Sequence, residues 1–576
     1  MYNNYTDEKN VSTLVSLLKE HNISKVIASP GTKNMTLVVS MENDSFFEMY
    51  SSVDERSAAY MACGLAAESG EPVVLSCTGA TASRNYLPGL TEAFYRKLPV
   101  LAITSDLIPH KLGHNIAQVI DRSSLPKDTA KLSVSLPIVK DEDDLWDCEI
   151  KANKAILELK HHGGGPVHIN LHTTLSKSYT TKELPKVRKI NRFTSLDELP
   201  ELPKVKIAIF LGSHITMNEE LTKIIDKFCE SNNAVVFCDH TSGYKGKYRI
   251  QFALVAGQLK GDISKITPDL LIHIGEVSGD YYSLNLRGGQ VWRVSQDGEL
   301  KDTFKKLKNV FEMPEDYFFR YYTDKNLEGK VSSYLAECKS RLFEIHNKIP
   351  DLPFSNIWIA SKIAQNIPDK STIHFGILNS LRSWNFFDLP HSVTSSSNVG
   401  GFGIDGNSSS LIGASLANKN KLYFGIIGDL AFFYDLNSLG NRHVGKNLRI
   451  LMVNNGKGTE FKQFTHVASK HGDRADTHVA AAGHFGNKSR SLVKNFSTDI
   501  GFEYISASNK EEFDKNYEHF LTPNITDRPM LFEVFTDNEK ESEALEILLN
   551  IDESIKGKAK ELLGDNGLKF INKLRK

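Results

Sequence analysis

Two short polar segments combine the residue types that bind a hard cation. Asp429 follows an apolar run at 421–427, within the sequence GIIGDLAFF, and Asn455 follows a second apolar run at 448–453. If both runs are parallel strands, their carboxyl ends meet at one edge of a sheet, where α/β enzymes bind ligands. Carboxylate and amide oxygens suit Mg²⁺, which would in turn hold a diphosphate. The alternative is two ordinary turns, because Gly-Asp and Asn-Gly pairs favour turns.

A second candidate is Glu55, in the sequence SVDERSAA at 52–59. The segment stands between an apolar strand and an alanine-rich helix, so we expect a carboxylate in a dry site with altered acidity. The alternative is an acidic residue that complements the dipole at a helix N-terminus. The spacing alone favours neither interpretation.

Further polar residues follow the apolar run at 100–104. His110, His114 and Gln118 lie in the loop after it, and histidine titrates near neutral pH, so these residues could donate or accept protons. Ser380 and Arg382, in an Asn-Ser-Leu-Arg sequence, could contact a substrate. The alternative for the histidines is an ordinary exposed loop. The alternative for Ser380 and Arg382 is a role outside the substrate site.

The elements that must position these residues are parallel strands, because short apolar runs alternate with helical patterns along almost the whole chain. A charged, proline-bearing stretch at 182–204 is typical of a linker. We therefore expect an α/β fold with a first domain over 1–180, a second over 205–345 and a third over 352–540. Apolar residues at helical spacing predict a helical C-terminal extension over 541–576.

Length and composition exclude several classes of protein. The 576 residues leave room for three or four domains at about 150 residues each. Lys and Arg total 69 against 70 Asp and Glu, so the basic excess of a nucleic-acid binder is missing. No secretory pattern and no apolar run of ~18 residues stand in the sequence, so we expect a cytoplasmic protein without a membrane partner. The six scattered cysteines lack zinc-binding spacing and predict reduced core thiols.

Together, the Gly-Asp and Asn-Asn segments resemble the cofactor motif of thiamine-diphosphate-dependent enzymes. The resemblance implies that Asp429, Asn455 and the carbonyl of Lys457 ligate Mg²⁺. It also implies that Gly428 and Leu430 contact the cofactor, with Leu430 standing where the motif commonly has Gly. In this superfamily a glutamate hydrogen-bonds to the pyrimidine ring, so that the cofactor's own amino group can deprotonate the thiazolium carbon.

Within that superfamily, five segments resemble the MenD family of the menaquinone pathway, which joins a decarboxylated 2-oxoglutarate to isochorismate. They are SPGTKN at 29–34, VDERSAA at 53–59, CTGATA at 77–82, GPVHIN at 165–170 and GIDG at 403–406. The likeness implies a pyrimidine-binding, a central and a diphosphate-binding domain, each a parallel sheet flanked by helices. It further implies that Glu55 holds the pyrimidine ring, that Thr78 contacts the cofactor, and that Ile404 forces its bent conformation.

The likeness breaks where the MenD pattern has arginines that grip the substrate carboxylates. The corresponding residues in this sequence are Lys33, Leu107, Val399 and Trp384. Lys does not reproduce a bidentate Arg–carboxylate pair, and the other three carry no charge. In addition, Glu460 stands where the family has an aliphatic residue beside the reacting carbon. These differences predict an acceptor less acidic than isochorismate.

We therefore predict a thiamine-diphosphate- and Mg²⁺-dependent enzyme that decarboxylates a 2-oxo acid and ligates the resulting carbanion to an acceptor. The residues expected to carry catalysis are Glu55, His114 and Gln118, and those expected to contact substrate are Lys33, Ser380, Arg382 and Glu460. The alternatives are a simple 2-oxo acid decarboxylase, an authentic MenD-type synthase, and a non-catalytic thiamine-fold subunit. The resemblance also implies a homodimer or a dimer of dimers that acts on small molecules.

Overall fold

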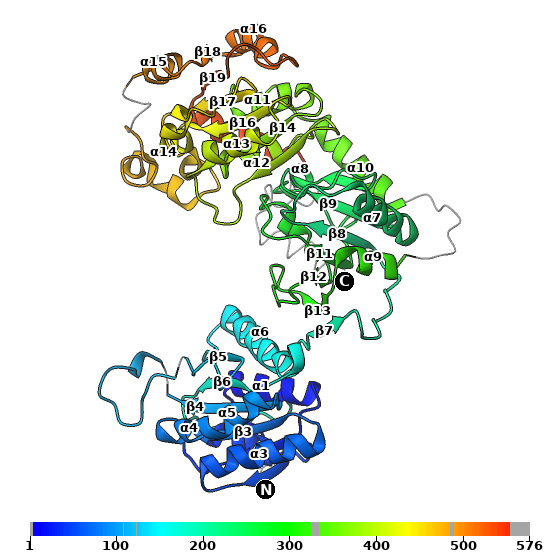
Figure 1. Ribbon diagram of the computed structural model, residues 1–576, viewed down its shortest axis with the longest axis vertical. Helices are drawn as coiled ribbons and strands as arrows, with labels where there is room; N and C mark the ends of the chain where they lie inside the picture. The colour runs from blue at the N-terminus through cyan, green and yellow to red at the C-terminus, as the bar shows by residue number, and fades with distance from the viewer. Residues whose placement is uncertain (1–3, 108, 123, 324–332, 484–488, 553–576) are drawn as a thin grey trace, which may run out of the picture. The chain divides into compact units, whose positions relative to one another are not determined.

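The computed structural model describes residues 4–107, 109–122, 124–323, 333–483 and 489–552 (Figure 1). The chain divides into two compact units, which are residues 1–197 with 298–312, and residues 198–297 with 313–576. The described residues form three sheets, whose strands pair in parallel and are flanked by helices. This confirms the α/β fold with three parallel sheets. The domain limits proposed from the sequence stay predictions.

The first unit contains a six-stranded parallel sheet. Its strands are β1 (Lys25–Ala28), β2 (Glu48–Ser51), β3 (Val73–Thr78), β4 (Val100–Asp106), β5 (Leu132–Leu136) and β6 (Val167–His172), in the order β2-β1-β3-β4-β6-β5. Its helices are α1 (Lys9–Glu20), α2 (Met35–Glu42), α3 (Glu55–Ser69), α4 (Thr81–Asn85), α5 (Leu87–Tyr95) and α6 (Glu142–Glu158). The same unit holds a parallel pair of short strands, β7 (Asn191–Thr194) and β13 (Leu307–Glu312).

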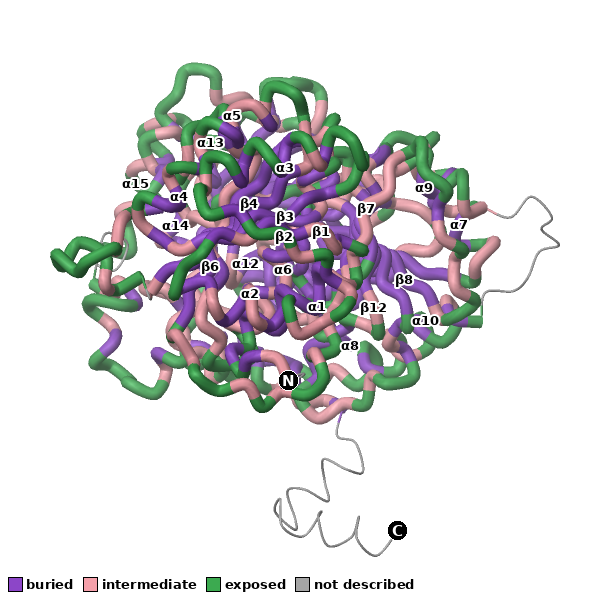
Figure 2. The backbone as a smooth tube through the Cα atoms, turned by 90° about the horizontal axis from the view of Figure 1, so that it is seen from below, coloured by how far each residue is buried: buried purple, intermediate pink, exposed green. Residues whose placement is uncertain are grey.

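Both faces of this sheet are covered, as strand β4 shows. Leu101 and Ile103 pack in a core cluster with residues of α1, α2 and α6. Val100 and Ala102, which alternate with them, pack against α3 and α5. Figure 2 shows the central strands β3 and β4 as buried. Because neighbouring side chains point to opposite faces, a strand covered on both sides is apolar throughout, which explains the unbroken apolar runs of the sequence.

The second unit contains two parallel sheets. The strands of the first are β8 (Ile207–Leu211), β9 (Val235–Cys238), β10 (Arg249–Gln251), β11 (Leu270–Ile274) and β12 (Gln290–Ser295), in the order β10-β9-β8-β11-β12. The helices of this part are α7 (Glu219–Asn232), α8 (Ala253–Ala256), α9 (Glu315–Tyr321) and α10 (Ser333–His346).

The second of these sheets carries the Gly-Asp and Asn-Asn segments. Its strands are β14 (Thr372–Phe375), β15 (Thr394–Ser397), β16 (Tyr423–Gly428), β17 (Leu448–Asn454), β18 (Glu503–Ala507) and β19 (Met530–Phe535), in the order β15-β14-β16-β17-β19-β18. Its helices are α11 (Asn356–Ile363), α12 (Asn379–Asn385), α13 (Asn407–Leu416), α14 (Asp429–Tyr434), α15 (Leu492–Asp499), α16 (Lys510–Phe520) and α17 (Asn538–Leu549). Of the predicted helical extension, residues 553–576 lie outside the described residues.

Short 3-10 helices connect several of these elements. They are η1 (Pro109–Lys111), η2 (His161–Gly163), η3 (Ser283–Leu286), η4 (Ala364–Asn366), η5 (Leu436–Gly440), η6 (Thr459–Lys462) and η7 (Val467–Ala475).

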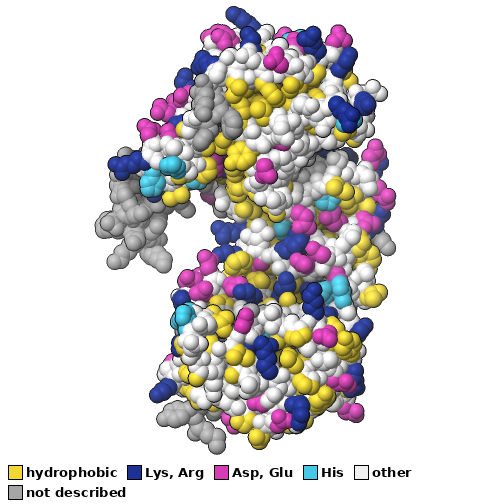
Figure 3. Space-filling view, turned by 60° about the vertical axis from the view of Figure 1, so that its left-hand side comes forward, with side chains coloured by type: hydrophobic (Ala, Val, Ile, Leu, Met, Phe, Trp, Pro, Cys, Tyr) yellow, Lys and Arg dark blue, Asp and Glu magenta, His cyan; other side chains and the backbone are white. Residues whose placement is uncertain are grey.

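The cysteines and the charged side chains lie in different parts of the molecule. All six cysteines are buried and carry free thiols. In the part of the chain that the structure describes, no helix has the length and apolar character needed to cross a bilayer. Figure 3 shows Lys and Arg side chains mixed with Asp and Glu over the face in view, in keeping with the formal charge of −1.

Candidate active site

Asp429 and Asn455 lie at the same edge of one sheet. Strands β16 and β17 pair in parallel with Gly428 opposite Val453, so Asp429, the first residue of α14, and Asn455, directly after β17, both follow the carboxyl ends of neighbouring strands. Asp429 is only 6% exposed, and its Oδ2 accepts a hydrogen bond of 2.9 Å from the backbone N–H of Gly456. The structure therefore brings the two parts of the motif together.

The polar atoms at this edge are short of partners. Burial raises the pKa of Asp429 to about 7, although hydrogen bonds from the backbone N–H groups of Gly456 and Leu430 lower it in part. Asn455 Oδ1 is buried and accepts no hydrogen bond from any described residue. Unpaired buried acceptors are costly, and a divalent cation with oxygen ligands would satisfy both groups at once. The residues present thus fit a Mg²⁺ ion.

The third predicted ligand, Lys457, pairs its side chain with another residue. Its Nζ lies 2.6 Å from Asp476 Oδ2, while its carbonyl accepts, from the described residues, a long hydrogen bond of 3.5 Å from the Thr459 hydroxyl. The carbonyl is therefore weakly used within the chain. This is consistent with the ligand role predicted for it.

Open space and an apolar support accompany the metal loop. A Cβ added at Gly428 would meet no atom within 4 Å, so there is room beside the loop for a bound group. Ile404 is half-buried and packs against the apolar cluster that includes Ile427 and Phe432. Its carbonyl accepts a 2.6 Å hydrogen bond from Asn407 Nδ2. Leu430 is half-buried, so the larger side chain at this position fits the turn.

Glu55 is the first residue of α3, directly after the N-cap residue Asp54, whose side chain accepts a hydrogen bond from the backbone N–H of Ser57. Glu55 Oε2 accepts a hydrogen bond of 3.2 Å from Asn85 Nδ2. The side chain is half-buried in this single chain. Contrary to expectation, the strand before it is not buried: β2 is an edge strand that pairs with β1, and its residues are mostly exposed. Short edge strands commonly carry polar side chains such as Glu48.

Lys33, Asp106 and Arg122 form an ion-paired group at the carboxyl end of β4. Lys33 Nζ lies 2.8 Å from Asp106 Oδ1 and donates a 2.6 Å hydrogen bond to the carbonyl of Gln118. Arg122 Nη2 lies 3.1 Å from the other oxygen of Asp106 and donates to Asn170 Oδ1 at 2.6 Å. The charge of Lys33, predicted to contact substrate, is therefore already paired within the chain.

Arg122 is a candidate that the sequence analysis missed. It is 2% exposed, yet its Nε and Nη1 have no hydrogen-bond partner among the described residues. Buried guanidinium donors without an acceptor are costly and favour an anion beside them. No motif surrounds Arg122, and only the fold places it beside Asp106, so the sequence offers no signal that would separate it from other arginines.

The loop between β4 and Arg122 presents its other polar residues to solvent. His110 and His114 are exposed, and so is Gln118. The backbone of Gln118 has a positive φ of 62°, and its carbonyl is held by Lys33. Within this chain, the two histidines therefore match the alternative of exposed loop residues. Thr78, at the end of β3, lies directly beneath the 29–34 loop, because a Cβ at Gly31 would stand 2.5 Å from Thr78 Cβ.

Arg382 and Glu460, predicted to contact substrate separately, contact each other. Arg382 Nη1 and Nη2 lie 2.7 and 2.8 Å from the two carboxylate oxygens of Glu460, a bidentate pair. The guanidinium also lies over the ring of Tyr281, 5.4 Å from its centroid. Nearby, Ser380 is buried and accepts a 3.4 Å hydrogen bond from Asn356 Nδ2. The positive charge of Arg382 is thus neutralised before any substrate binds.

Two of the positions where the family pattern has arginines belong to the core. Trp384 is fully buried, and its Nε1 donates a 3.1 Å hydrogen bond to Asn356 Oδ1. Val399 is 4% exposed. Leu107 is half-buried, and its backbone N–H donates to Asp106 Oδ1. None of the three side chains can pair with a carboxylate.

Comparisons with known proteins find a matching family model and relatives that align over most of the chain. Residues 9–125 match the family model described as thiamine pyrophosphate enzyme, N-terminal TPP binding domain. A protein of Phocaeicola vulgatus is 30% identical over 568 residues, covering 94% of this chain and 98% of its own. A protein of Bacteroides fragilis is 30% identical over 558 residues, with the same coverage. A protein of Flavobacterium johnsoniae is 26% identical over 553 residues, covering 91% of this chain and 95% of its own.

All three relatives carry the name 2-succinyl-5-enolpyruvyl-6-hydroxy-3-cyclohexene-1-carboxylate synthase. The similarity extends over nearly the full length of both chains and includes the thiamine-binding domain. It confirms the resemblance seen in the sequence and the prediction of a thiamine-diphosphate-dependent decarboxylase and carboligase. The chain therefore belongs to the family of 2-succinyl-5-enolpyruvyl-6-hydroxy-3-cyclohexene-1-carboxylate synthases, within the thiamine-diphosphate-dependent enzymes.

Proposed function

We propose that the protein, with thiamine diphosphate and Mg²⁺, decarboxylates a 2-oxo acid and ligates the remaining fragment to an acceptor less acidic than isochorismate. The observation that supports this acceptor is the pairing of cations inside the chain. Lys33 is paired with Asp106, and Arg382 with Glu460. A carboxylate that enters a closed site without a charged partner loses several kcal/mol of hydration. An acceptor with fewer carboxylates avoids that cost.

The metal loop would hold the diphosphate end of the cofactor. Asp429, Asn455 and the carbonyl of Lys457 would ligate Mg²⁺, since the first two present buried oxygens in need of a partner. The bound cofactor supplies the electron sink for decarboxylation. Ile404, packed on its apolar cluster, would support the cofactor rings, and the loop beside Gly428 leaves room for the phosphates.

Glu55 would hold and move the proton that activates the cofactor. Its position at the first turn of α3 fixes the backbone, and the hydrogen bond from Asn85 Nδ2 orients one carboxylate oxygen. A carboxylate held this way can accept a hydrogen bond from a ring nitrogen and share its proton. His114 and Gln118, on the exposed loop after β4, are proposed to serve proton transfer on the substrate side.

We further propose a homodimer, or a dimer of dimers, in which a second copy covers Glu55. Three large apolar side chains close to Glu55 in the sequence are exposed in the single chain: Val53 is 81% exposed, Tyr60 49% and Met61 45%. Exposed apolar surface of this kind is typical of an interface. A partner that covers them would exclude water from the carboxylate and strengthen its interactions.

The dimer can be tested by mixing two inactive variants. If Glu55 of one copy and Asp429 of the other serve the same site, Glu55→Gln and Asp429→Ala proteins should regain part of the activity after subunit exchange. A hybrid dimer then contains one site with both native residues. Mass labelling establishes that the subunits have exchanged. If no activity returns after that exchange, a shared site is contradicted.

Arg122 favours a second candidate function, the reaction named for the relatives. Its two unpartnered buried donors could hold one carboxylate in place of a missing family arginine. The same residue could instead hold the carboxylate of the 2-oxo acid. The two candidates differ in the acceptor, not in the cofactor chemistry.

Product analysis separates the candidates. The purified protein, loaded with thiamine diphosphate and Mg²⁺, is incubated with 2-oxoglutarate or other 2-oxo acids and with a panel of acceptors, and products are identified by mass spectrometry. Ligation to neutral or monoanionic acceptors, with poor use of isochorismate, supports the first proposal. Efficient ligation to isochorismate supports the second. Aldehyde products alone indicate a simple decarboxylase, and no product together with no cofactor binding indicates a non-catalytic subunit.

A further inference from the structure

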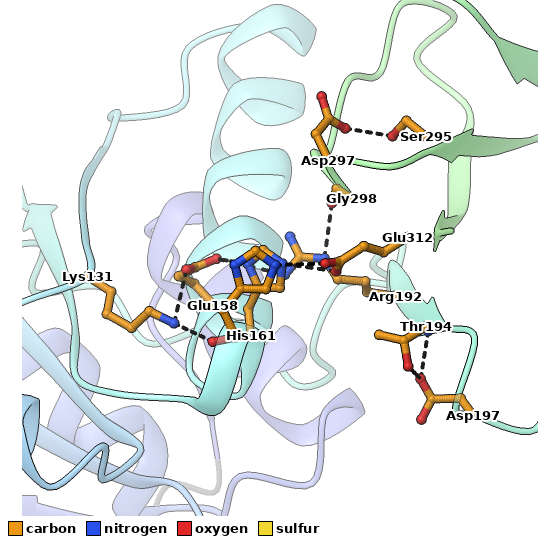
Figure 4. Close-up of polar contacts among 11 residues, drawn as sticks. Lys131, Glu158, His161, Arg192, Thr194, Asp197, Ser295, Asp297, Gly298 and Glu312 are labelled. Carbon is orange, nitrogen blue, oxygen red and sulfur yellow. Dashed lines mark hydrogen bonds and ion pairs between the residues drawn. The ribbon is translucent and has the colours of Figure 1, made fainter. Parts of the chain in front are cut away.

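Two histidines and a glutamate that have no part in the proposed cofactor and substrate binding meet in the first unit. His161 and His162 lie in η2, directly after α6, and Glu312 is the last residue of β13. Glu312 accepts from both rings: its Oε2 lies 2.9 Å from His161 Nε2 and its Oε1 lies 2.8 Å from His162 Nε2. The three candidate ligand atoms all lie within 4.8 Å of one another. Figure 4 shows His161 and Glu312 pointing toward each other from separate elements.

The backbone at His162 is what makes the two rings neighbours. Consecutive side chains of a helix diverge by about 100°, so adjacent histidines normally point apart. His162 has φ 45° and ψ 51°, a left-handed conformation that residues other than glycine rarely adopt. The turn brings its ring beside that of His161, with the centroids 3.8 Å apart. The local chain therefore presents two imidazoles to one carboxylate.

Both ring nitrogens of His161 contact carboxylates. Its Nδ1 lies 2.9 Å from Glu158 Oε2, and its Nε2 lies 2.9 Å from Glu312 Oε2. A neutral imidazole has only one N–H to donate, so both contacts can be hydrogen bonds to carboxylates only if the ring is an imidazolium. A metal ion between Nε2 and Glu312 removes that requirement, because both atoms then act as ligands. The Nδ1–H remains to donate to Glu158.

Two cations lie beside Glu158. Lys131 Nζ lies 3.4 Å from its Oε1, and Arg192 Nη1 lies 3.8 Å from its Oε2. A carboxylate that accepts from the second nitrogen of a metal-binding histidine fixes the ring orientation and raises its basicity. Glu158 occupies that position relative to His161.

We propose that His161, His162 and Glu312 bind a divalent transition metal ion of the Zn²⁺ type, with Glu158 as the positioning residue. Two imidazoles and a carboxylate are a ligand set that suits Zn²⁺ and leaves one position for water or a further ligand. Mg²⁺ prefers oxygen ligands alone, so this ion differs from the one proposed at Asp429. The metal would join η2 to the end of β13 and so stabilise the first unit.

Metal retention tests the proposal on the intact chain. The protein is first saturated with Mg²⁺ and thiamine diphosphate to fill the proposed cofactor site, then loaded with Zn²⁺, desalted and analysed by elemental mass spectrometry. We expect about one Zn²⁺ per chain for the native protein, the stoichiometry of a single site, and a loss of most of it in His162→Ala and in Glu312→Gln. The matched control is His519→Ala, because His519 is also an exposed histidine that contacts a glutamate, 2.7 Å from Glu503.

Binding of Co²⁺ in place of Zn²⁺ gives a second measurement. It changes on substitution if the residues bind the metal, and it does not change if they only support the fold. Visible absorption bands of a low-symmetry Co²⁺ site should appear in the native protein and in His519→Ala and disappear in His162→Ala. Glu158→Gln should bind one ion with an affinity lowered by about 10- to 100-fold, the usual effect of removing a group that orients a ligand. Circular dichroism establishes that each variant is folded.

Three results would overturn the site. They are native protein that retains no Zn²⁺ after desalting, equal retention in His162→Ala and Glu312→Gln, and Co²⁺ spectra that the substitutions leave unchanged. If both single variants fail to fold, the Glu158→Gln titration decides, because an affinity equal to that of the native protein contradicts the proposed geometry.

Discussion

The residues that follow β16 and β17 and the residues that follow β4 both stand at the carboxyl ends of interior strands, but their buried polar groups lack opposite kinds of partner. Next to β16, Asp429 and Asn455 present buried oxygens without enough donors. Next to β4, Arg122 presents buried N–H groups without enough acceptors. Buried polar groups are normally satisfied, so a cation would satisfy the first group of residues, which we call the cation-requiring loop, and an anion would satisfy the second, the anion-requiring loop. Under the proposed function, the first binds the metal and the cofactor and the second binds a substrate carboxylate.

The largest effect is expected at the cation-requiring loop. Asp429→Ala removes the charged ligand, so Mg²⁺-dependent binding of thiamine diphosphate should weaken by at least about 10³-fold, equivalent to ~4 kcal/mol. Isothermal titration calorimetry measures it directly. Asp473→Ala is the control, because the side chain of Asp473 is 99% exposed in the same unit, and its binding should be native. Unchanged cofactor affinity in Asp429→Ala would remove this loop from the site.

A smaller but still large effect is expected at Glu55. Glu55→Gln keeps the shape and can still accept the hydrogen bond from Asn85, but it cannot share a proton. We expect kcat to fall by about 10²- to 10⁴-fold, the range for a proton-transfer group, while the Kd for the cofactor stays within a few-fold. Steady-state rates and calorimetry separate the two. A native kcat would contradict the assignment.

Arg122 tests the anion-requiring loop. Arg122→Ala should raise KM for the carboxylate-bearing substrate by about 10- to 100-fold, since a hydrogen bond to a charged group contributes ~1.5–3 kcal/mol. Arg122→Lys keeps the charge but loses the planar fork, and it should recover only part of the loss. Affinity for the cofactor is the internal control and should stay native, because Asp429 and Asn455 are unchanged in these variants. Equal KM values in all three proteins would assign Arg122 a purely structural role.

The cation-requiring loop was predictable and the anion-requiring loop was not, for a physical reason. Asp429 and Asn455 each follow an apolar strand within a few residues, so parallel strands would place both at carboxyl ends, and the resemblance to a cofactor motif favoured a site over two ordinary turns. Arg122 and Asp106 are separated by a loop without regular periodicity, and only the folded chain shows that they meet. The pairing of Arg382 with Glu460 has the same origin, because their elements α12 and η6 are far apart in sequence. The fold class followed from the alternation of strands and helices.

His162 shows a further limit of sequence reasoning. The histidine pair precedes three glycines, of which Gly163 and Gly164 have a positive φ, as glycine readily does in a turn. The left-handed conformation of His162 itself follows no composition rule, and Glu312 is distant in the chain. A site that depends on one unusual backbone conformation and on a contact between residues distant in the chain leaves no pattern in the sequence.

The smallest effect is expected at Glu541, a buried acid that we compare with Asp429. Glu541 on α17 is fully buried, and its Oε1 accepts hydrogen bonds from the Thr536 hydroxyl and the backbone N–H of Asn356. Burial raises its pKa from 4.5 to about 7. Unlike Asp429, it belongs to no cation-binding motif, so we expect a proton rather than a metal ion to satisfy it.

The pH dependence of stability reveals which acid takes a proton. Between pH 4.5 and 7 the unfolded chain has lost the proton of Glu541 while the folded chain retains it, so this group's contribution to stability falls as pH rises. The loss approaches roughly 3 kcal/mol above pH 7, at 1.36 kcal/mol per pKa unit. Glu541→Gln should therefore raise Tm at pH 8 and change it little at pH 4.5, with or without Mg²⁺. A Tm gain at pH 8 that Mg²⁺ abolishes would show that Glu541 takes a cation as Asp429 does, and the distinction between the two acids would fail.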